Sequence, residues 1–192
     1  MIQAVMENLI GGYLHPRASV RRLLAGRHGI DAAVAMVVLA WVVREMFFIL
    51  VPGGRQGGEG VSFVYYLVGL IDSLITFGLF SLMVCYVGHM FGGKANFPDT
   101  ALVVAWYLLV TSIIVPLILP AVISIVEAAR AGTEVPGGPG FVVMASSAVM
   151  LWLLASYIAE LHRFARTWQV LGALLGFSIL FSFVFSGLMS GV

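Results

Sequence analysis

Residues 88–100 read Gly-His-Met-Phe-Gly-Gly-Lys-Ala-Asn-Phe-Pro-Asp-Thr, and this stretch decides the fold. It is a short polar elbow between two apolar segments that are each long enough to cross a bilayer. Pro98 and Asp99 predict the start of a helix, because proline fits the first helical turn and a carboxylate is stabilised at the positive end of the helix dipole. The apolar run that follows is too long and too poor in charge for a soluble core helix. We therefore expect the elbow to lie at a membrane surface.

The composition excludes a soluble protein. Of the 192 residues, 61% are hydrophobic and only 10% are charged, whereas soluble domains average about 25% charged residues. A net charge of +1 gives no support to a nucleic-acid partner, which requires clustered cations. Cys85 is the single cysteine, so an intrachain disulfide and a cysteine metal site are excluded. Motifs such as Gly-x-Ser-x-Gly or a Walker loop are absent from the sequence, and we expect neither an enzyme nor a cofactor.

Five apolar segments predict an all-α membrane bundle with five transmembrane helices. The expected spans are residues 30–51, 61–91, 98–129, 141–161 and 168–188. Turns rich in glycine and proline, at 52–60 and 131–140, separate the first span from the second and the third from the fourth. Residues 30–192 thus form the transmembrane domain, and residues 1–29 form a short cytoplasmic segment.

Basic residues predict the orientation of this bundle. With five spans, seven of them fall on one side: Arg17, Arg21, Arg22, Arg27, Lys94, Arg163 and Arg166. Only Arg55 and Arg130 fall in loops on the other side. By the positive-inside rule, the N terminus is cytoplasmic and the C terminus lies outside, which suits a multi-pass protein of a bacterial inner membrane.

The N-terminal segment contains a basic amphipathic stretch after His15-Pro16. Its apolar side chains share one helical face, and three arginines are placed to reach lipid phosphates: Arg17, Arg21 and Arg22. This pattern predicts a short helix that lies along the bilayer surface. The same arginines also serve as a positive-inside flank.

Charged residues within the first two spans form a candidate polar site, which consists of Arg44, Glu45 and Asp72. A charge at such depth costs roughly 2.5–3.5 kcal/mol on insertion scales, so these side chains are expected to face the protein interior and to pair. Counted along the helices, Arg44 and Asp72 reach similar depths, which makes a direct pair reasonable. Two interpretations remain open: a structural ion pair that fixes helix register, or a binding site for an ion or anionic group.

Polar residues also gather at the cytoplasmic helix ends, where His89, Lys94, Glu160 and His162 are found. Two histidines and a carboxylate could ligate a metal, but they lack the i, i+4 spacing of a helix-borne site. Solvated helix ends are the favoured interpretation, and no metal site is expected.

The third and fifth spans carry further signals. Pro116 and Pro120 remove two backbone donors and should bend the third span. Small residues give the fifth span a face for close helix packing, at Gly172, Gly176, Ser178 and Ser182. Such a face serves packing within the chain or contact with a second copy.

The arrangement resembles the Yip family, the five-pass membrane proteins with a Ypt/Rab-interacting protein domain. The likeness rests on the basic stretch after His15-Pro16, on the elbow with Gly92, Gly93, Lys94, Phe97, Pro98 and Asp99, and on the junction around Arg166 and Trp168. In this family such an elbow opens the third span. The resemblance, to a compact bacterial-type member, implies five helices, a cytoplasmic N terminus and no catalytic activity.

Three functions follow as hypotheses. The first is a non-enzymatic membrane adaptor or organiser that acts through helix contacts and the cytoplasmic elbow, with the bilayer and another membrane protein or a second copy as partners. The second is a transporter or channel subunit for a small solute or ion that uses Arg44, Glu45 and Asp72. The third is an anionic-lipid binder that uses Arg17, Arg21, Arg22 and Lys94. A water-filled cavity that reaches Asp72 would favour transport, and a dry, ion-paired bundle would favour the adaptor.

Overall fold

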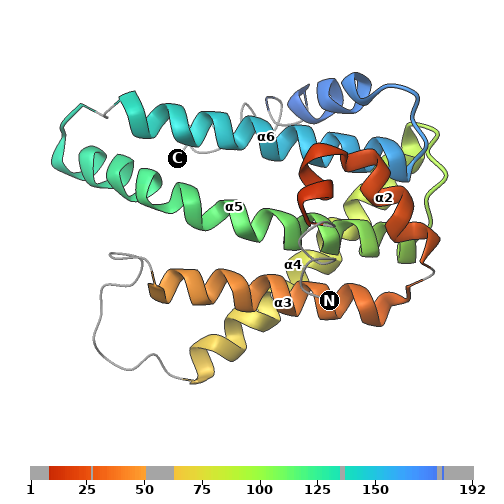
Figure 1. Cartoon of the computed structure of the whole chain (residues 1–192), viewed down its shortest axis with the longest axis horizontal. Helices are drawn as coiled ribbons and strands as arrows, with labels where there is room; N and C mark the ends of the chain where they lie inside the picture. The colour runs from red at the N-terminus through yellow and green to blue at the C-terminus, as the bar shows by residue number, and fades with distance from the viewer. Residues whose placement is uncertain (1–8, 27, 51–62, 135–136, 177–178, 180–192) are drawn as a thin grey trace, which may run out of the picture.

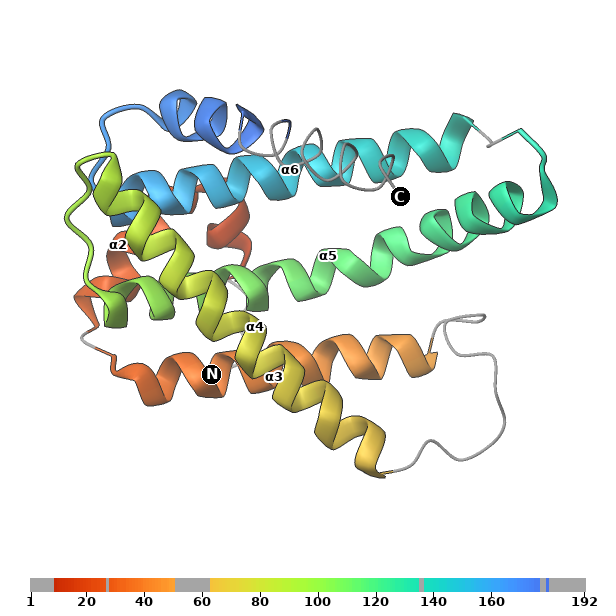
Figure 2. The same cartoon turned by 180° about the vertical axis from the view of Figure 1, so that it is seen from behind.

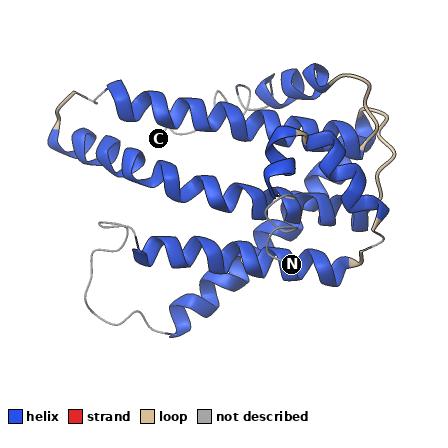
Figure 3. Ribbon diagram, in the orientation of Figure 1, coloured by secondary structure: helices blue, strands red, loops and turns tan. Residues whose placement is uncertain are grey.

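The computed structural model describes residues 9–26, 28–50, 63–134, 137–176 and 179, and these residues form helices and short connections without a strand (Figure 3). The labelled helices, in chain order, are α2 (Pro16–Ala25), α3 (Ile30–Leu50), α4 (Phe63–Met90), α5 (Phe97–Ala131) and α6 (Gly137–Leu161). A short helical segment over residues 9–14 precedes α2, and a further helix covers residues 167–176. The all-α prediction is confirmed for the described part of the chain.

Four of these helices, α3, α4, α5 and α6, have the length and apolar composition to cross a membrane. With 21, 28, 35 and 25 residues, they extend about 32 to 52 Å, against a bilayer core of about 30 Å. Large apolar side chains point outward on them, for example Val68 at 58% and Leu79 at 64% exposure. Apolar surface of this extent suits acyl chains rather than water. The described part of the molecule thus has the character of a helical membrane protein, with four candidate membrane-spanning helices.

The expected fifth span falls only partly on described residues. The helix over residues 167–176 begins where that span was predicted to begin, and residues 177–178 and 180–192 lie outside the described part. The predicted limits of the first three spans differ from α3, α4 and α5 by at most two residues at each described end.

The fourth span begins earlier than expected. Residues 137–140, predicted as part of a turn, form the first turn of α6. Glycine and proline are tolerated there because the first four N–H groups of a helix have no partner within the helix, so a proline at this position removes no hydrogen bond.

Helix α5 is the centre of the bundle. It packs against α3, α4 and α6, and also against α2, and Figures 1 and 2 show it between α3 and α6. Ala101 and Ala105 are fully buried on α5, which allows the neighbouring backbones to approach closely. Pro116 and Pro120 lie inside α5, which continues as one helix through both of them.

The N-terminal segment lies against this bundle, and its predicted position along the bilayer surface stays a prediction. Val20 of α2 is fully buried against the core. The Tyr13 hydroxyl donates to the carbonyl of Val110 in α5, and the Tyr157 hydroxyl of α6 donates to the Gly12 carbonyl at 3.1 Å. The apolar face of this amphipathic segment is therefore covered by protein, because α5 and α6 offer it both apolar surface and polar partners.

The elbow has the helix-start chemistry that its sequence predicts. Asn96 caps α5, since its side chain accepts a hydrogen bond from the Asp99 amide at 2.8 Å. Pro98 occupies the first turn and Asp99 is the acidic residue there. Gly92 adopts φ +81°, a left-handed conformation that glycine takes without steric cost.

Two glycines make room for a histidine at this end of the bundle. The ring of His162, which follows α6, lies so close to Gly88 and Gly93 that a Cβ on either would collide with it. His162 is almost completely buried, and its ring stacks on Phe164 with centroids 5.6 Å apart. This contact joins the α4–α5 elbow to the end of α6.

We predict that Gly88→Ala and Gly93→Ala each destabilise the protein by about 1–3 kcal/mol, because the added methyl overpacks the site against His162. Gly78→Ala is the matched control on α4: no described atom lies within 4 Å of a Cβ at this position. The control substitution should leave the free energy of unfolding unchanged or raise it by up to about 1 kcal/mol, because alanine has a higher helix propensity than glycine. Thermal unfolding of the detergent-purified protein measures all three. Equal melting temperatures for Gly88→Ala and Gly78→Ala would contradict the packing described.

Candidate functional site

A cavity of about 230 Å³ lies between α3, α4 and α5. Its polar lining comes from all three helices and consists of Trp41, Arg44, Asp72, Ser73, Thr76, Thr111 and Ser112. Thr111 is 14 residues into α5, about 21 Å from the elbow end of the bundle. This depth places the cavity within the membrane-spanning part of the helices.

Arg44 contributes the cation of this cavity. Its Nη2 donates to Ser73 Oγ at 3.3 Å, and Ser73 Oγ in turn donates to the Gly69 carbonyl at 2.8 Å. The nearest carboxylate in an ion pair with Arg44 is that of its neighbour Glu45, at 3.8 Å. The Glu45 side chain is 15% exposed and that of Arg44 41%. Arg44 is thus held by Ser73 while much of its side chain stays accessible.

Asp72 lines the same cavity, so the structure brings together the two charges that the sequence placed at similar depth. The ion pairs among the described residues do not include an Arg44–Asp72 pair. Asp72 is exposed, nine residues into α4, about 14 Å from the start of the described helix. A carboxylate at such depth requires water, a cation or a polar ligand.

Further groups in the lining can form hydrogen bonds with a ligand. The indole Nε1 of Trp41 is buried and has no hydrogen-bond partner among the described residues. Pro116 lacks an N–H, so the carbonyl of Ser112, which lines the cavity, loses its helical donor. A buried donor or acceptor without a partner costs about 1–3 kcal/mol. The cavity therefore combines a cation, a carboxylate and unused hydrogen-bonding groups, as a small polar solute or hydrated ion requires.

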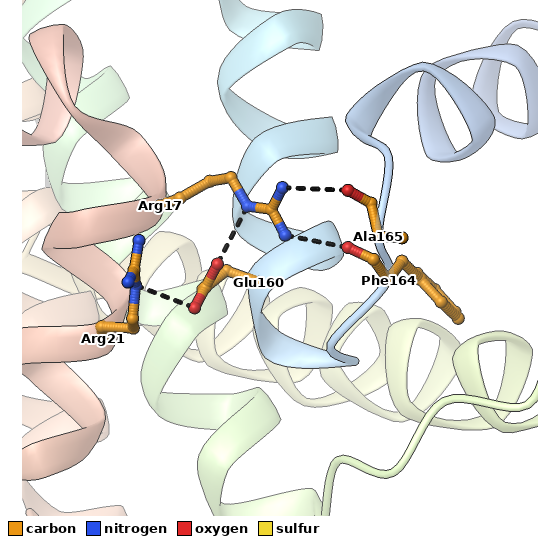
Figure 4. Close-up of polar contacts among 5 residues, drawn as sticks. All are labelled: Arg17, Arg21, Glu160, Phe164 and Ala165. Carbon is orange, nitrogen blue, oxygen red and sulfur yellow. Dashed lines mark hydrogen bonds and ion pairs between the residues drawn. The ribbon is translucent and has the colours of Figure 1, made fainter.

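A second polar cluster fixes α2 to the end of α6 (Figure 4). Arg17 Nε donates to Glu160 at 2.9 Å, and Arg21 Nε lies 3.0 Å from the other oxygen of the same carboxylate. Arg17 also donates to the carbonyls of Phe164 at 2.8 Å and Ala165 at 3.5 Å. Two of the three arginines predicted to reach lipid phosphates are thus bound to protein groups, and Arg22 is exposed without an ion pair in the described part.

The histidines at this end do not form a metal site in the described chain, where no group of three or more potential ligands is found. His89 Nε2 lies 2.6 Å from the Ala95 carbonyl. Neither ring nitrogen of His162 has a hydrogen-bond partner among the described residues. Burial lowers the pKa of His162, the backbone of Val84 opposes this shift, and the neighbouring His89 adds to it. His162 is therefore a buried packing group, and the solvated helix end that the sequence favoured is wrong for this residue.

The remaining predicted residues lie apart from the cavity. Lys94 and Pro98 of the elbow are exposed, whereas Phe97 is half-buried. No described atom lies within 4 Å of a Cβ placed on Gly172 or Gly176, so the predicted close helix packing at these glycines has no counterpart in the described chain. Ser178 and Ser182 lie outside the described residues.

Sequence reasoning did not include Ser73, Thr76 and Thr111 in the polar site. Thr76 lies one helical turn after Asp72, so spacing on one helix could have found it. Ser73 directly follows Asp72 and is rotated by about 100° around the helix, so the same spacing does not single it out. Thr111 on α5 carries no such signal, because its place depends on how α5 packs against α4.

Comparisons with protein-family models, curated proteins and solved structures find no match to this chain. The resemblance to the Yip family therefore stays a prediction.

The contacts of Arg17 predict an ordered series of stabilities. Arg17→Ala should cost about 1.5–3 kcal/mol, because it removes charge-assisted hydrogen bonds to Glu160 and to the carbonyl after α6. Arg21→Ala should cost about 1 kcal/mol or less, since the Arg21 side chain is 68% exposed. Arg22→Ala is the control and should leave stability unchanged. The stability of each variant is measured by thermal unfolding and by the rate of tryptic cleavage within α2. Equal values for Arg17→Ala and Arg22→Ala would refute the assigned role.

Proposed function

We propose that this chain is a non-enzymatic, multi-pass membrane protein that binds a small polar solute or ion in the cavity between α3, α4 and α5, as a transporter or channel subunit does. The observation that carries the proposal is that Arg44 and Asp72 line one cavity without pairing with each other in the described structure. Arg44 contacts Glu45 and Ser73 but keeps 41% of its side chain exposed, and Asp72 is exposed. Both side chains can therefore meet a ligand in the cavity.

The size and position of the cavity support the same function. A volume of 230 Å³ is the share of about seven to eight liquid waters, which suits a small solute or a partly hydrated ion. Pro116 lies on α5 one turn after Ser112. A proline in a membrane helix leaves a weaker point in the hydrogen-bond ladder, at which α5 can change its course.

A second candidate function is the membrane adaptor of the Yip type. The favouring observation is the interlocked end of the bundle, where α2, the elbow and the loop after α6 are held together by Arg17, Glu160 and His162. A rigid end of this kind presents a fixed surface to another membrane protein. Isolation from native membranes in mild detergent with a stoichiometric protein partner would support this candidate, and isolation without one would count against it.

Water access to the cavity separates the two candidates. In a Cys85→Ser background, we expect Thr76→Cys and Ser73→Cys to react with a membrane-impermeant thiosulfonate, because water fills a polar cavity that reaches these positions. Leu79→Cys is the matched control on α4: this position is 64% exposed but lies outside the cavity lining. It should react at least tenfold more slowly, since a thiol in acyl chains ionises poorly.

Equal rates at Thr76→Cys and Leu79→Cys would contradict the solute-binding function and would favour the adaptor. Arg44→Gln in the Thr76→Cys background provides a further readout. It should change the labelling rate by an anionic reagent more than the rate by a cationic one, because it removes the positive charge beside the thiol.

We further propose five passes, a cytoplasmic N terminus, an outside C terminus and a bacterial inner membrane. Six described basic residues occupy the end that contains α2 and the elbow, namely Arg17, Arg21, Arg22, Lys94, Arg163 and Arg166, and Arg130 is the described one at the opposite end. Figures 1 and 2 show that one end of the bundle contains α2, the end of α4, the start of α5 and the end of α6. This asymmetry follows the positive-inside rule.

Reporter fusions test the topology. Alkaline phosphatase fused after residue 192 should be active and green fluorescent protein at the same place should be dark, because a fifth crossing places the C terminus outside. The matched control ends at residue 166, before the last crossing, and should give the reverse pattern. A fluorescent C-terminal fusion without phosphatase activity would overturn the five-pass proposal.

A further inference from the structure

A second and larger cavity lies toward the basic end of the bundle, by which we mean the end that contains α2, the elbow and the loop after α6. It has a volume of about 770 Å³ and lies between α4, the end of α6 and the helix over residues 167–176. Its described lining is apolar except for Gln169. This cavity shares neither charge nor ligand chemistry with the polar cavity discussed above.

The depth of this cavity corresponds to one leaflet. Along α4 its lining runs from Phe91, just after the helix, to Phe80, a distance of about 16 Å at 1.5 Å per residue. Half of a bilayer core of about 30 Å is about 15 Å. An apolar cavity of this length, which begins at the elbow end of α4, can accommodate a lipid acyl chain.

Basic side chains lie at the same end of the bundle as this cavity. Gly93 and His162 are in contact, and each is directly followed by a basic residue, Lys94 and Arg163. The chain therefore brings these two cations near each other, although 68 residues separate them in sequence. Arg166 follows Phe164, a lining residue, by two positions.

These cations are available to a ligand. Lys94, Arg163 and Arg166 are exposed, and none forms an ion pair within the described residues. The nearby carboxylate of Glu160 is bound by Arg17 and Arg21. Asp99 is a further carboxylate on the elbow, and it forms no ion pair with these cations within the described residues. Three exposed cations against this one carboxylate leave the surface beside the cavity positively charged.

We propose that this end of the molecule binds an anionic phospholipid, with an acyl chain in the apolar cavity and the phosphate at Lys94, Arg163 and Arg166. Neither feature alone would select this ligand. A basic surface alone would attract any anion, and an apolar cavity alone would accept any lipid. The combination selects a lipid that carries a negative headgroup.

Native mass spectrometry of the full chain tests this site. The protein is released from detergent after incubation with equal amounts of phosphatidylglycerol and phosphatidylcholine that carry the same acyl chains. We expect at least tenfold preferential retention of phosphatidylglycerol. The triple variant Lys94→Gln, Arg163→Gln and Arg166→Gln should reduce the preference to less than threefold. Arg130→Gln, a cation at the opposite end, is the control and should keep the wild-type preference.

The cavity is tested separately from the charges. Ala173→Trp fills the apolar lining and should lower retention of both lipids, and Gly176→Leu provides a second filling variant if the first does not fold. Glycerol phosphate, which lacks acyl chains, should not displace bound phosphatidylglycerol at millimolar concentration. Equal retention of the two lipids by the wild type, unchanged retention in a folded filling variant, or displacement by glycerol phosphate would each overturn the proposal.

Discussion

The contact between one buried ring and two glycines joins the two halves of this bundle. His162 ends the hairpin of α5 and α6, whereas Gly88 and Gly93 frame the elbow between α4 and α5. Without side chains at these two positions, the elbow can lie directly on the ring. Neither ring nitrogen has a hydrogen-bond partner among the described residues, and burial lowers the pKa of the ring. Steric fit, rather than hydrogen bonding, therefore sets the distance between α4 and α6 at this end.

The distance between α4 and α6 also fixes the positions of the charged side chains at this end of the bundle. With α6 fixed against the elbow, Glu160 is positioned to bind Arg17 and Arg21, and α2 is held over α5 and α6. The same arrangement binds Arg17 and one side of Arg21 to Glu160, although the Arg21 side chain stays 68% exposed. Cations that are not used in this way lie on the elbow and on the loop after α6. Some basic side chains at this end thus bind the N-terminal segment to α6, and others are exposed.

The sequence predicts the helices well because lipid leaves few alternatives. A backbone in a bilayer core must satisfy its hydrogen bonds within a helix, so long apolar segments translate directly into α3, α4, α5 and α6. Pro98 and Asp99 marked the start of α5 because helix-start chemistry is local. The sequence did not predict the early start of α6. Glycine and proline are typical of turns but are also tolerated in the first turn of a helix, so residues 137–140 fit both structures.

The candidate site was less accessible to sequence reasoning. The cost of charge in a membrane singled out Arg44 and Asp72, and both line the polar cavity. Helix depth alone suggested a direct pair, but depth leaves the rotation of each helix undetermined. Ser73 rather than Asp72 meets the guanidinium, a difference of one residue and thus of about 100° around α4. Contacts of α5 with α4 depend on packing in three dimensions, which periodicity does not encode.

Helix α4 connects the two cavities. Phe80 lines both of them, on one side the polar cavity with Asp72 and on the other the apolar cavity with Phe91. A close-packed aromatic side chain cannot move into one space without changing the other. The outward face of α4 carries large apolar side chains, such as Leu79, that are exposed among the described residues. A tilt of α4 would therefore alter the volumes of both cavities together.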